Sequence, residues 1–132
     1  MQRLTIIAHN TQGLFADIAE LLANNKIDIN SVDSQISDQD VYIHMMVSDY
    51  DLSLRLLTQA GYNVASDESV LLRVKDAPGA LAKLSRRISD HGIDTRSMSM
   101  LHQNQVHSIV AISTDNNTEV LRLFSDIAVY QR

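Results

Sequence analysis

Two short loops combine residue types that suit the binding of a small carboxylic acid. Residues 10–13 read Asn-Thr-Gln-Gly, and residues 76–79 read Asp-Ala-Pro-Gly. In each loop a polar residue stands three positions before a glycine, and an apolar helix-like segment follows. The first N–H groups of a helix lack intrahelical partners and lie at the positive end of its dipole, which favours a carboxylate. Glycine also lets a ligand approach the backbone closely.

The polar residue of each loop has two interpretations. Asn10 and Asp76 are placed to meet the α-amino group of a ligand bound at the loop. The same residue types also cap helices and form turns, so a purely structural capping role stays open for both. Asn10 is a neutral hydrogen-bonding residue suited to a zwitterion, whereas Asp76 belongs to the loop that contains proline. The two loops are therefore candidates of equal rank.

The loops belong to an internal repeat with an offset of 66 residues. Gly13 and Gly79 each open a segment with apolar residues at the i, i+3, i+7 spacing of a helix with one buried face. The matching helix positions are Phe15 with Leu81, Ile18 with Leu84, and Leu22 with Ile88. The preceding segments alternate like strands facing a core, and there Leu4, Ile6 and Ala8 match Val70, Leu72 and Val74.

The turn after the first helix differs between the copies. Gly92 stands where a left-handed conformation is favourable for glycine, and Lys26 stands at the matching position of the first copy. We therefore expect a different or slightly strained turn at Lys26.

Each copy continues with a hairpin, a second helix and a short final strand. In the first copy we expect strands at 29–36 and 41–47, a helix at 50–60 and a strand at 62–66. In the second copy we expect strands at 95–103 and 106–113, a helix at 116–124 and a strand at 127–131. Asp49 and Asp115 are the expected N-caps of the second helices.

The order strand, helix, strand, strand, helix, strand occurs twice. It predicts an α+β protein of two ferredoxin-like βαββαβ modules in tandem, each with an antiparallel sheet covered by helices on one face. We expect the first module at residues 1–66 and the second at 67–132. A unit of about 66 residues buries only roughly 60% of its unfolded surface, so we expect the modules to pack together and a homodimer to form.

The repeat resembles the ACT family of small regulatory modules. The resemblance is carried best by Val74 to Leu84, which contains Pro78-Gly79, and by Asp90 to Asp94. The first copy keeps Asn10 and Gly13 but has Gln12 where the family usually has proline. Together the copies cover essentially the whole of this sequence, so we expect no catalytic domain to be regulated within it.

The resemblance implies an amino-acid-binding regulatory protein whose ligand lies at an interface between modules. The loop contacts that it implies are Asn10, Gln12, Gly13 and Leu14 in the first copy and Asp76, Pro78, Gly79 and Ala80 in the second. The family also uses the start of the second strand of a neighbouring module, which corresponds to Asp28 and Asp94; solvated carboxylates are the alternative there. Many ACT modules bind nothing and serve only to assemble, so a regulatory subunit without a ligand is the competing function.

Other classes of function have little support. No cysteine is present, and none of the familiar nucleophile, phosphate-loop or metalloprotease motifs occurs, so we expect neither catalysis nor a cofactor. His102 and His107 would face each other across a two-residue hairpin turn, but a third metal ligand is not evident. A formal net charge of −5 disfavours direct nucleic-acid binding. Without an apolar segment of membrane-spanning length or a signal peptide, we expect a cytoplasmic protein with no membrane association.

The sequence thus predicts a small sensor. We expect its partners to be a free amino acid or similar zwitterion, a second copy of the chain and a regulated protein.

Overall fold

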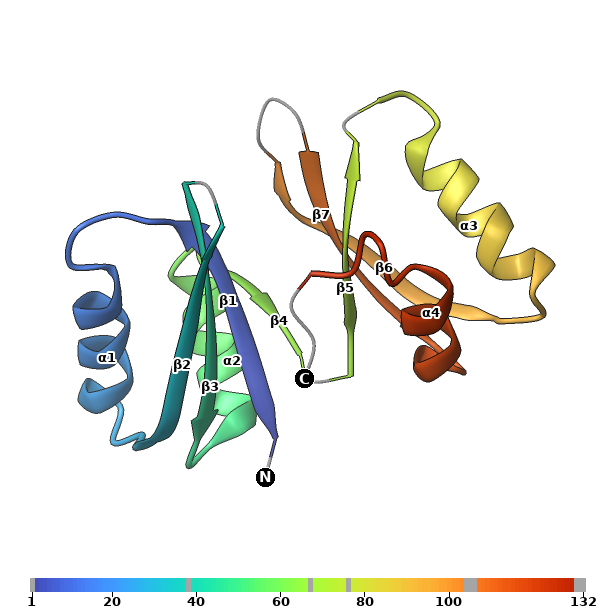
Figure 1. The fold of residues 1–132 in the computed structure, drawn as a ribbon. Coiled ribbons are helices and arrows are strands. Elements are labelled where there is room, and N and C mark those ends of the chain that lie inside the picture. Colours follow the sequence, from blue (N-terminus) through green and yellow to red (C-terminus); the bar gives the residue numbers. More distant parts are fainter. Residues whose placement is uncertain (1, 38, 67, 76, 104–106, 130–132) are drawn as a thin grey trace. The chain divides into compact units, whose positions relative to one another are not determined.

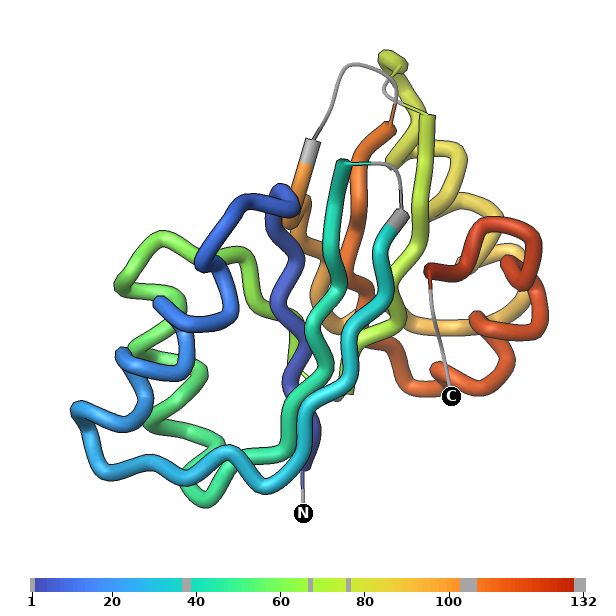
Figure 2. The backbone as a smooth tube through the Cα atoms, turned by 60° about the vertical axis from the view of Figure 1, so that its left-hand side comes forward, coloured from blue at the N-terminus to red at the C-terminus, as the bar shows by residue number. Residues whose placement is uncertain are grey.

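The first unit is a complete βαββαβ module. The computed structural model describes residues 2–37, 39–66, 68–75, 77–103 and 107–129, and the chain divides into two compact units, residues 1–67 and 68–132. The first contains β1 (Arg3–His9), α1 (Leu14–Asn24), β2 (Ile29–Ser37), β3 (Asp40–Val47), α2 (Tyr50–Gln59) and β4 (Asn63–Ala65). Its antiparallel sheet has the order β2-β3-β1-β4, and both helices lie on one side of it (Figures 1 and 2).

The second unit repeats this order. It contains β5 (Val70–Lys75), α3 (Ala80–Asp90), β6 (Thr95–Gln103), β7 (His107–Thr114) and α4 (Asn117–Leu123), with the sheet order β5-β7-β6. Of the final strand predicted at 127–131, residues 130 and 131 lie outside the described residues, and the remainder forms a single antiparallel bridge between Leu72 and Ala128. Hydrogen bonds from the Arg73 N–H to the Ile127 carbonyl and from the Val129 N–H to the Leu71 carbonyl, both 2.8 Å, flank the bridge. The fold class predicted from the sequence is confirmed.

Each module has its own core between the sheet and the two helices. The alternating strand residues face the helices as predicted, and both Leu4 and Leu72 are fully buried. In the first module the helices contribute Ile18, Leu22 and Leu57 to the core. In the second they contribute Leu84, Ile88, Val120 and Phe124.

The second helix of each module starts at a side-chain cap. The Leu52 N–H donates to Asp49 Oδ1 at 3.1 Å, and the Glu119 N–H donates to Asn116 Oδ1 at 3.2 Å. Asp49 is thus the predicted cap, but the prediction of Asp115 is wrong by one residue. The Asp115 carboxylate instead accepts from the Asp94 N–H at 3.0 Å, which joins the beginning of β6 to the end of β7.

The turns after α1 and α3 have the same left-handed conformation and matching hydrogen bonds, so strain, and not a different turn, is what the structure shows at Lys26. Gly92 has a φ of 73° and Lys26 has a φ of 60°, the one non-glycine residue with positive φ among those described. A side chain in this left-handed region is disfavoured by its Cβ. The first module therefore retains a strained turn where the second has an unstrained one.

A β-bulge distinguishes the second hairpin from the first. In β2 the register runs without a break from Ser31 to Ser37, whereas in β6 it shifts between Met100 and His102. The two N-caps of the second helices, Asp49 and Asn116, are accordingly 67 residues apart rather than 66. One inserted residue is thus accommodated within β6, where a bulge reverses the side to which later residues point.

Polar contacts secure the short helix α4. The Arg87 guanidinium lies 4.6 Å from the centre of the Phe124 ring and donates to the Leu123 carbonyl at 3.2 Å, which ties α3 to the end of α4. On the surface of α4, Arg122 pairs with Glu119 and hydrogen-bonds to it, which lowers the pKa of the Glu119 carboxyl.

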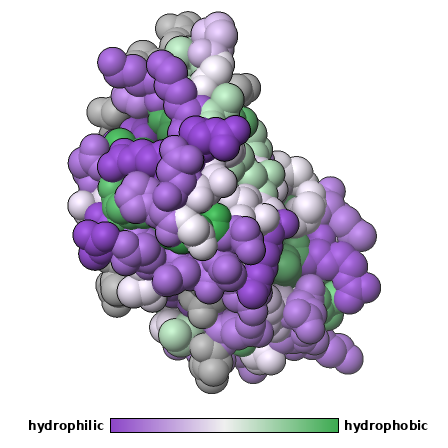
Figure 3. Space-filling model, turned by 90° about the vertical axis from the view of Figure 1, so that its right-hand side faces the viewer, coloured by the Kyte–Doolittle hydropathy of each residue, from purple (hydrophilic) through white to green (hydrophobic). Residues whose placement is uncertain are grey.

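The face of the molecule drawn in Figure 3 is mainly hydrophilic, with scattered apolar side chains. No helix within the described ranges is long and apolar enough to cross a membrane.

Candidate functional site

Both glycine loops form the same tight turn. Gly13 has φ 79° and ψ 3°, and Gly79 has φ 81° and ψ 0°. These angles belong to the third residue of a type II turn, which favours glycine there and proline just before it. The turn's hydrogen bond is present in both modules, from the Leu14 N–H to the Thr11 carbonyl at 3.3 Å and from the Ala80 N–H to the Ala77 carbonyl at 3.2 Å. Gln12 and Pro78 occupy the second position of the turn.

This turn presents backbone N–H groups at the start of α1. The first N–H that bonds within the helix is that of Asp17, which donates to the Gly13 carbonyl at 2.9 Å. The N–H groups of Phe15 and Ala16 precede it and have no helical acceptor. Both residues line a cavity at this end of the helix. The arrangement can bind an anion through two amides and the helix dipole.

The cavity of the first module has a volume of about 480 Å³, sufficient for a small metabolite. One end is formed by the loop and the beginning of α1, including Asn10, Thr11 and Gly13. The remainder is formed by strand residues, including Val32 and Ile36 of β2. It lies entirely within residues 10–43.

The walls of this cavity are exposed apolar side chains. Val32 is 45% exposed and Ile36 is 62% exposed, and Phe15 of α1 is exposed as well. Val32 and Ile36 pair with Met45 and Val41, which face the core, so they lie on the helix side of the edge strand β2. Asp33 between them alternates to the opposite side. Large apolar residues left open beside a cavity indicate a surface that an apolar group can cover.

Asn10 lies at the polar end of the cavity. Its side chain is exposed and has no hydrogen bond to any described residue, while its N–H donates to the Gln39 carbonyl at 2.8 Å. The alternative that Asn10 serves as a helix cap is therefore not supported. Asp76, the corresponding residue of the second module, lies outside the described residues.

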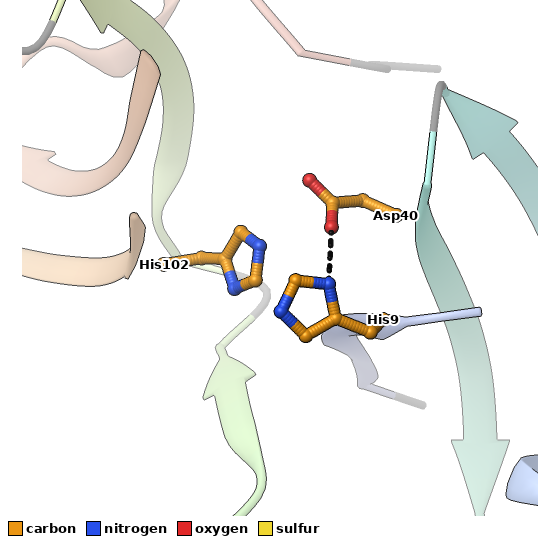
Figure 4. Close-up of side chains that lie close together, drawn as sticks. All are labelled: His9, Asp40 and His102. Carbon is orange, nitrogen blue, oxygen red and sulfur yellow. Dashed lines mark ion pairs between the residues drawn. The ribbon is translucent and has the colours of Figure 1, made fainter. Parts of the chain in front are cut away.

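His9 does not line the cavity, although it directly precedes Asn10. Its Nδ1 lies 3.2 Å from an oxygen of Asp40, and Figure 4 shows the two side chains turned toward each other. Both residues occupy the side of the sheet opposite the helices, because Ala8 and Val41 beside them face the core. Together with the Asn10 hydrogen bond, this contact anchors the start of the loop to the β2–β3 hairpin.

Asp28 and Asp94 are not brought to the loops of their own modules. Asp28 lies at the start of β2, where its N–H donates to Ser48 Oγ at 2.9 Å. Since β1 and β2 are both antiparallel to β3, the loop after β1 lies near the far end of β2. The intervening strand is roughly 25 Å long. Asp28 can therefore contact a ligand at a glycine loop only from a different module, and the same topology applies to Asp94.

The second module has a corresponding cavity of about 370 Å³. The Lys83 N–H is the first to bond within α3, to the Gly79 carbonyl at 3.0 Å, so the N–H groups of Leu81 and Ala82 precede the helical ladder. These two residues line the cavity together with Met100 of β6 and Ser108 of β7.

Sequence reasoning located the loops but missed the strand residues. Of the predicted loop residues, Asn10, Gly13, Leu14, Gly79 and Ala80 line the cavities, whereas Gln12 and Pro78 are not among the lining residues. The missed contributors include Phe15 of α1 and the strand residues Val32, Ile36, Met100 and Ser108. For Val32, Ile36 and Met100 the available signal was an apolar side chain on the helix-facing side of an edge strand, whereas Ser108 gave no such signal.

The predicted facing pair of histidines is wrong. His102 pairs with Ile109, and His107 lies beside Lys75 of β5. Gln103 pairs with Ser108, so the two histidines are not cross-strand partners, and residues 104 and 105, expected to form the turn, lie outside the described residues.

Comparison with known protein families finds a match to part of the first module. Residues 1–52 match the family model of the ACT domain. This segment contains the first glycine loop, α1 and the β2–β3 hairpin. No curated protein sequence matches the chain.

Several solved structures are similar to the chain over most of its length. Protein BT0572 from Bacteroides thetaiotaomicron is 21% identical, with 97% of this chain and 90% of that chain covered and a TM-score of 0.49. The regulatory subunit of aspartate kinase from Thermus thermophilus, in a ligand-free form, is 14% identical, with 95% and 91% covered and a TM-score of 0.44. The acetolactate synthase small subunit from Thermotoga maritima is also 14% identical, with 98% and 89% covered and a TM-score of 0.42.

Proposed function

We propose that this chain, of which residues 1–52 match the ACT-domain model, is a regulatory protein that binds a free amino acid at the Gly13 loop. The observation that carries the proposal is the cavity of the first module. It has unsatisfied backbone amides at one end and exposed apolar walls along its length. A carboxylate and an apolar side chain on one small molecule match both ends.

Each part of an amino acid has a counterpart in the cavity. The α-carboxylate would accept hydrogen bonds from the Phe15 and Ala16 N–H groups, which lie at the positive end of α1. The α-amino group would donate to the Asn10 side-chain oxygen. An aliphatic side chain would cover Val32 and Ile36. We therefore expect L-valine, L-leucine or L-isoleucine to bind more tightly than glycine.

The regulatory role rests on the match of residues 1–52 to the ACT-domain model. A ligand regulates only if it binds two states of the protein or its assembly with different affinity. Asp28 can join the site only from another module, and a homodimer would supply one. Ligand-dependent association of copies, or of this chain with a regulated protein, would transmit binding.

A thermal-shift screen against the twenty amino acids tests binding. A ligand that binds only the native state raises the melting temperature in a concentration-dependent manner. Titration calorimetry of the best ligand then gives the dissociation constant. Absence of a shift for every amino acid at millimolar concentration would contradict the proposal.

Gly13→Ala locates the site, and Gly61→Ala is its matched control. Both glycines have positive φ, at 79° and 95°, and an added Cβ meets no atom within 4 Å at either position. Each substitution should therefore cost about 1–2 kcal/mol of stability through backbone strain alone. Only Gly13→Ala should weaken ligand binding, by at least about tenfold, because it displaces the amides at the start of α1. Equal affinities in the two variants would place the ligand elsewhere.

Assembly without a ligand is the second candidate function. β2 is an edge strand of the first sheet, and a peptide strand can add to such an edge. If no amino acid binds but the chain captures a partner through β2, this alternative is favoured. Proline substitution at Ser34 would then weaken partner binding by removing a backbone donor.

A further inference from the structure

We propose that Ser108 determines specificity in the second module, by making its glycine-loop cavity select a small carboxylic acid that carries an additional hydrogen-bonding group. The proposal shares with the proposed function the idea that a glycine loop binds a carboxylate. It differs in the module, in the chemistry of the ligand and in the residue that recognises it.

Ser108 is the observation that points to a ligand. The residue is only 1% exposed, and its Oγ has no hydrogen-bond partner among the residues that the structure describes. Ser108 pairs with Val74 and stands two residues before Val110, which places it on the helix-facing side of β7. There it lines the cavity beneath the Gly79 loop. Buried hydroxyl groups are nearly always paired, so an unpaired one beside a cavity indicates a missing partner.

The first module has an apolar residue at the same place. Val41 of β3 pairs with Ala8 as Ser108 of β7 pairs with Val74, and Val41 lines the first cavity. The two cavities therefore share the turn and the free amides but differ by a hydroxyl group at the strand. Such a difference suits ligands that differ in the polarity of their side chains.

The carboxylate of the ligand would bind at the other end of the cavity. The N–H groups of Leu81 and Ala82 precede the hydrogen-bond ladder of α3, a helix of 11 residues, and both residues line the cavity. A ligand bound there by its carboxylate directs its remaining atoms toward the strands. A hydroxyl or amide group would then reach Ser108 after rotation of the serine side chain, while Met100 covers the adjacent apolar atoms.

L-threonine and L-valine are the probes that isolate this contact. They have nearly the same shape, and threonine has a hydroxyl where valine has a methyl group. In the Gly13→Ala background, where the first site is impaired, we expect L-threonine to bind more tightly than L-valine. L-serine and L-asparagine extend the series.

Ser108→Ala should change stability and binding in opposite directions. Removing a buried unpaired hydroxyl should raise the melting temperature of the ligand-free protein. Removing the partner of the ligand should weaken threonine binding by about 3- to 10-fold and leave valine binding unchanged. A purely structural serine would not produce this selective loss.

Ser108→Val and Gly79→Ala complete the test by titration calorimetry. Ser108→Val introduces the side chain that Val41 provides in the first module, and it should reverse the ligand preference from threonine to valine. Gly79→Ala should abolish binding of both, whereas Gly92→Ala, at a glycine of similar φ, should abolish neither.

The proposal is overturned if L-threonine, L-serine and L-asparagine all fail to bind, or if Ser108→Ala lowers threonine and valine affinity equally. The outcome is independent of the first site. Threonine binding that depends on Ser108 supports this proposal even if Gly13→Ala has no effect on any ligand.

Discussion

The two modules have the same turn at the glycine loop but achieve it with different residues. In the second module Pro78 precedes Gly79, whereas in the first Gln12 precedes Gly13, and the angles at the two glycines differ by only a few degrees. The turn therefore requires glycine at its third position, while proline at the second only favours it. The comparison shows that glutamine in place of proline leaves the loop geometry unchanged.

The modules diverge more strongly in the parts that surround the loop. The second module has a bulge in β6, Ser108 in the cavity and a ring–guanidinium contact between α3 and α4. In the first module the register of β2 is unbroken from Ser31 to Ser37, β2 carries exposed apolar side chains, and Val41 lines the cavity. A shared backbone thus supports two different cavities. The predictions below test how far this difference extends.

The largest expected effect comes from the core position that the second helices share. Leu57 of α2 and Phe124 lie eight residues after their N-caps, and both are buried. Leu57→Ala should cost about 2–5 kcal/mol and Phe124→Ala about 3–5 kcal/mol, through lost burial and a cavity. Phe124→Ala also removes the ring beneath Arg87. Urea denaturation measures the free energy of unfolding of both variants. A smaller loss of stability for Phe124→Ala than for Leu57→Ala would contradict the importance assigned to Phe124 in holding α4.

Exchanging lysine and glycine in the turns after α1 and α3, at Lys26 and Gly92, should change stability in opposite directions. Lys26→Gly relieves a left-handed lysine, and we expect a gain of about 0.5–1 kcal/mol after the entropy of glycine is subtracted. Gly92→Lys should cost about 1 kcal/mol or more for the same reason. The melting temperatures of the two variants, compared with that of the unmodified protein, show whether each substitution stabilises or destabilises it. Stabilisation by both would disprove the strain assigned to Lys26.

Exchanging the second residue of the glycine turns should have a smaller effect. Gln12→Pro should stabilise the first module by about 0.4–1 kcal/mol, because proline reduces the entropy of the unfolded chain where the turn already suits it. Pro78→Gln should destabilise the second module by a similar amount. Ligand binding at the first loop should persist in Gln12→Pro, and its loss would show that Gln12 itself contacts the ligand.

The smallest effect concerns the surface of α4. The guanidinium of Arg122 lowers the pKa of the Glu119 carboxyl, and the first module has Leu52 at the position of Glu119. A carboxyl with a lowered folded-state pKa stabilises the protein above its unfolded-state pKa, and this contribution is lost as the pH falls through the folded-state pKa. Glu119→Gln should therefore slightly reduce the dependence of the melting temperature on pH below 5. If the melting temperature of Glu119→Gln depends on pH below 5 as that of the unmodified protein does, the Glu119–Arg122 pair adds nothing to stability.

The sequence by itself determined the local structure of this protein. Alternating apolar residues in β1 and β5, helical spacing after Gly13 and Gly79, and the glycine at position 92 all follow rules that act over a few residues. These rules predicted the tandem fold, the loops and the unusual turn at Lys26. They placed the cap of α4 one residue too early because Asp115 and Asn116 are both suitable cap residues.

Only the tertiary structure decided what the loops face. Val32 and Ile36 reach the Gly13 loop because β1 and β2 run in the same direction on either side of β3, while Asp28 is carried to the far end. The bulge at Met100 and the burial of Ser108 depend equally on strand pairing. Pairing joins residues distant along the chain, and a register shift of one residue reverses every side chain beyond it. The composition of each cavity is therefore a property of the folded sheet and not of the loop motif.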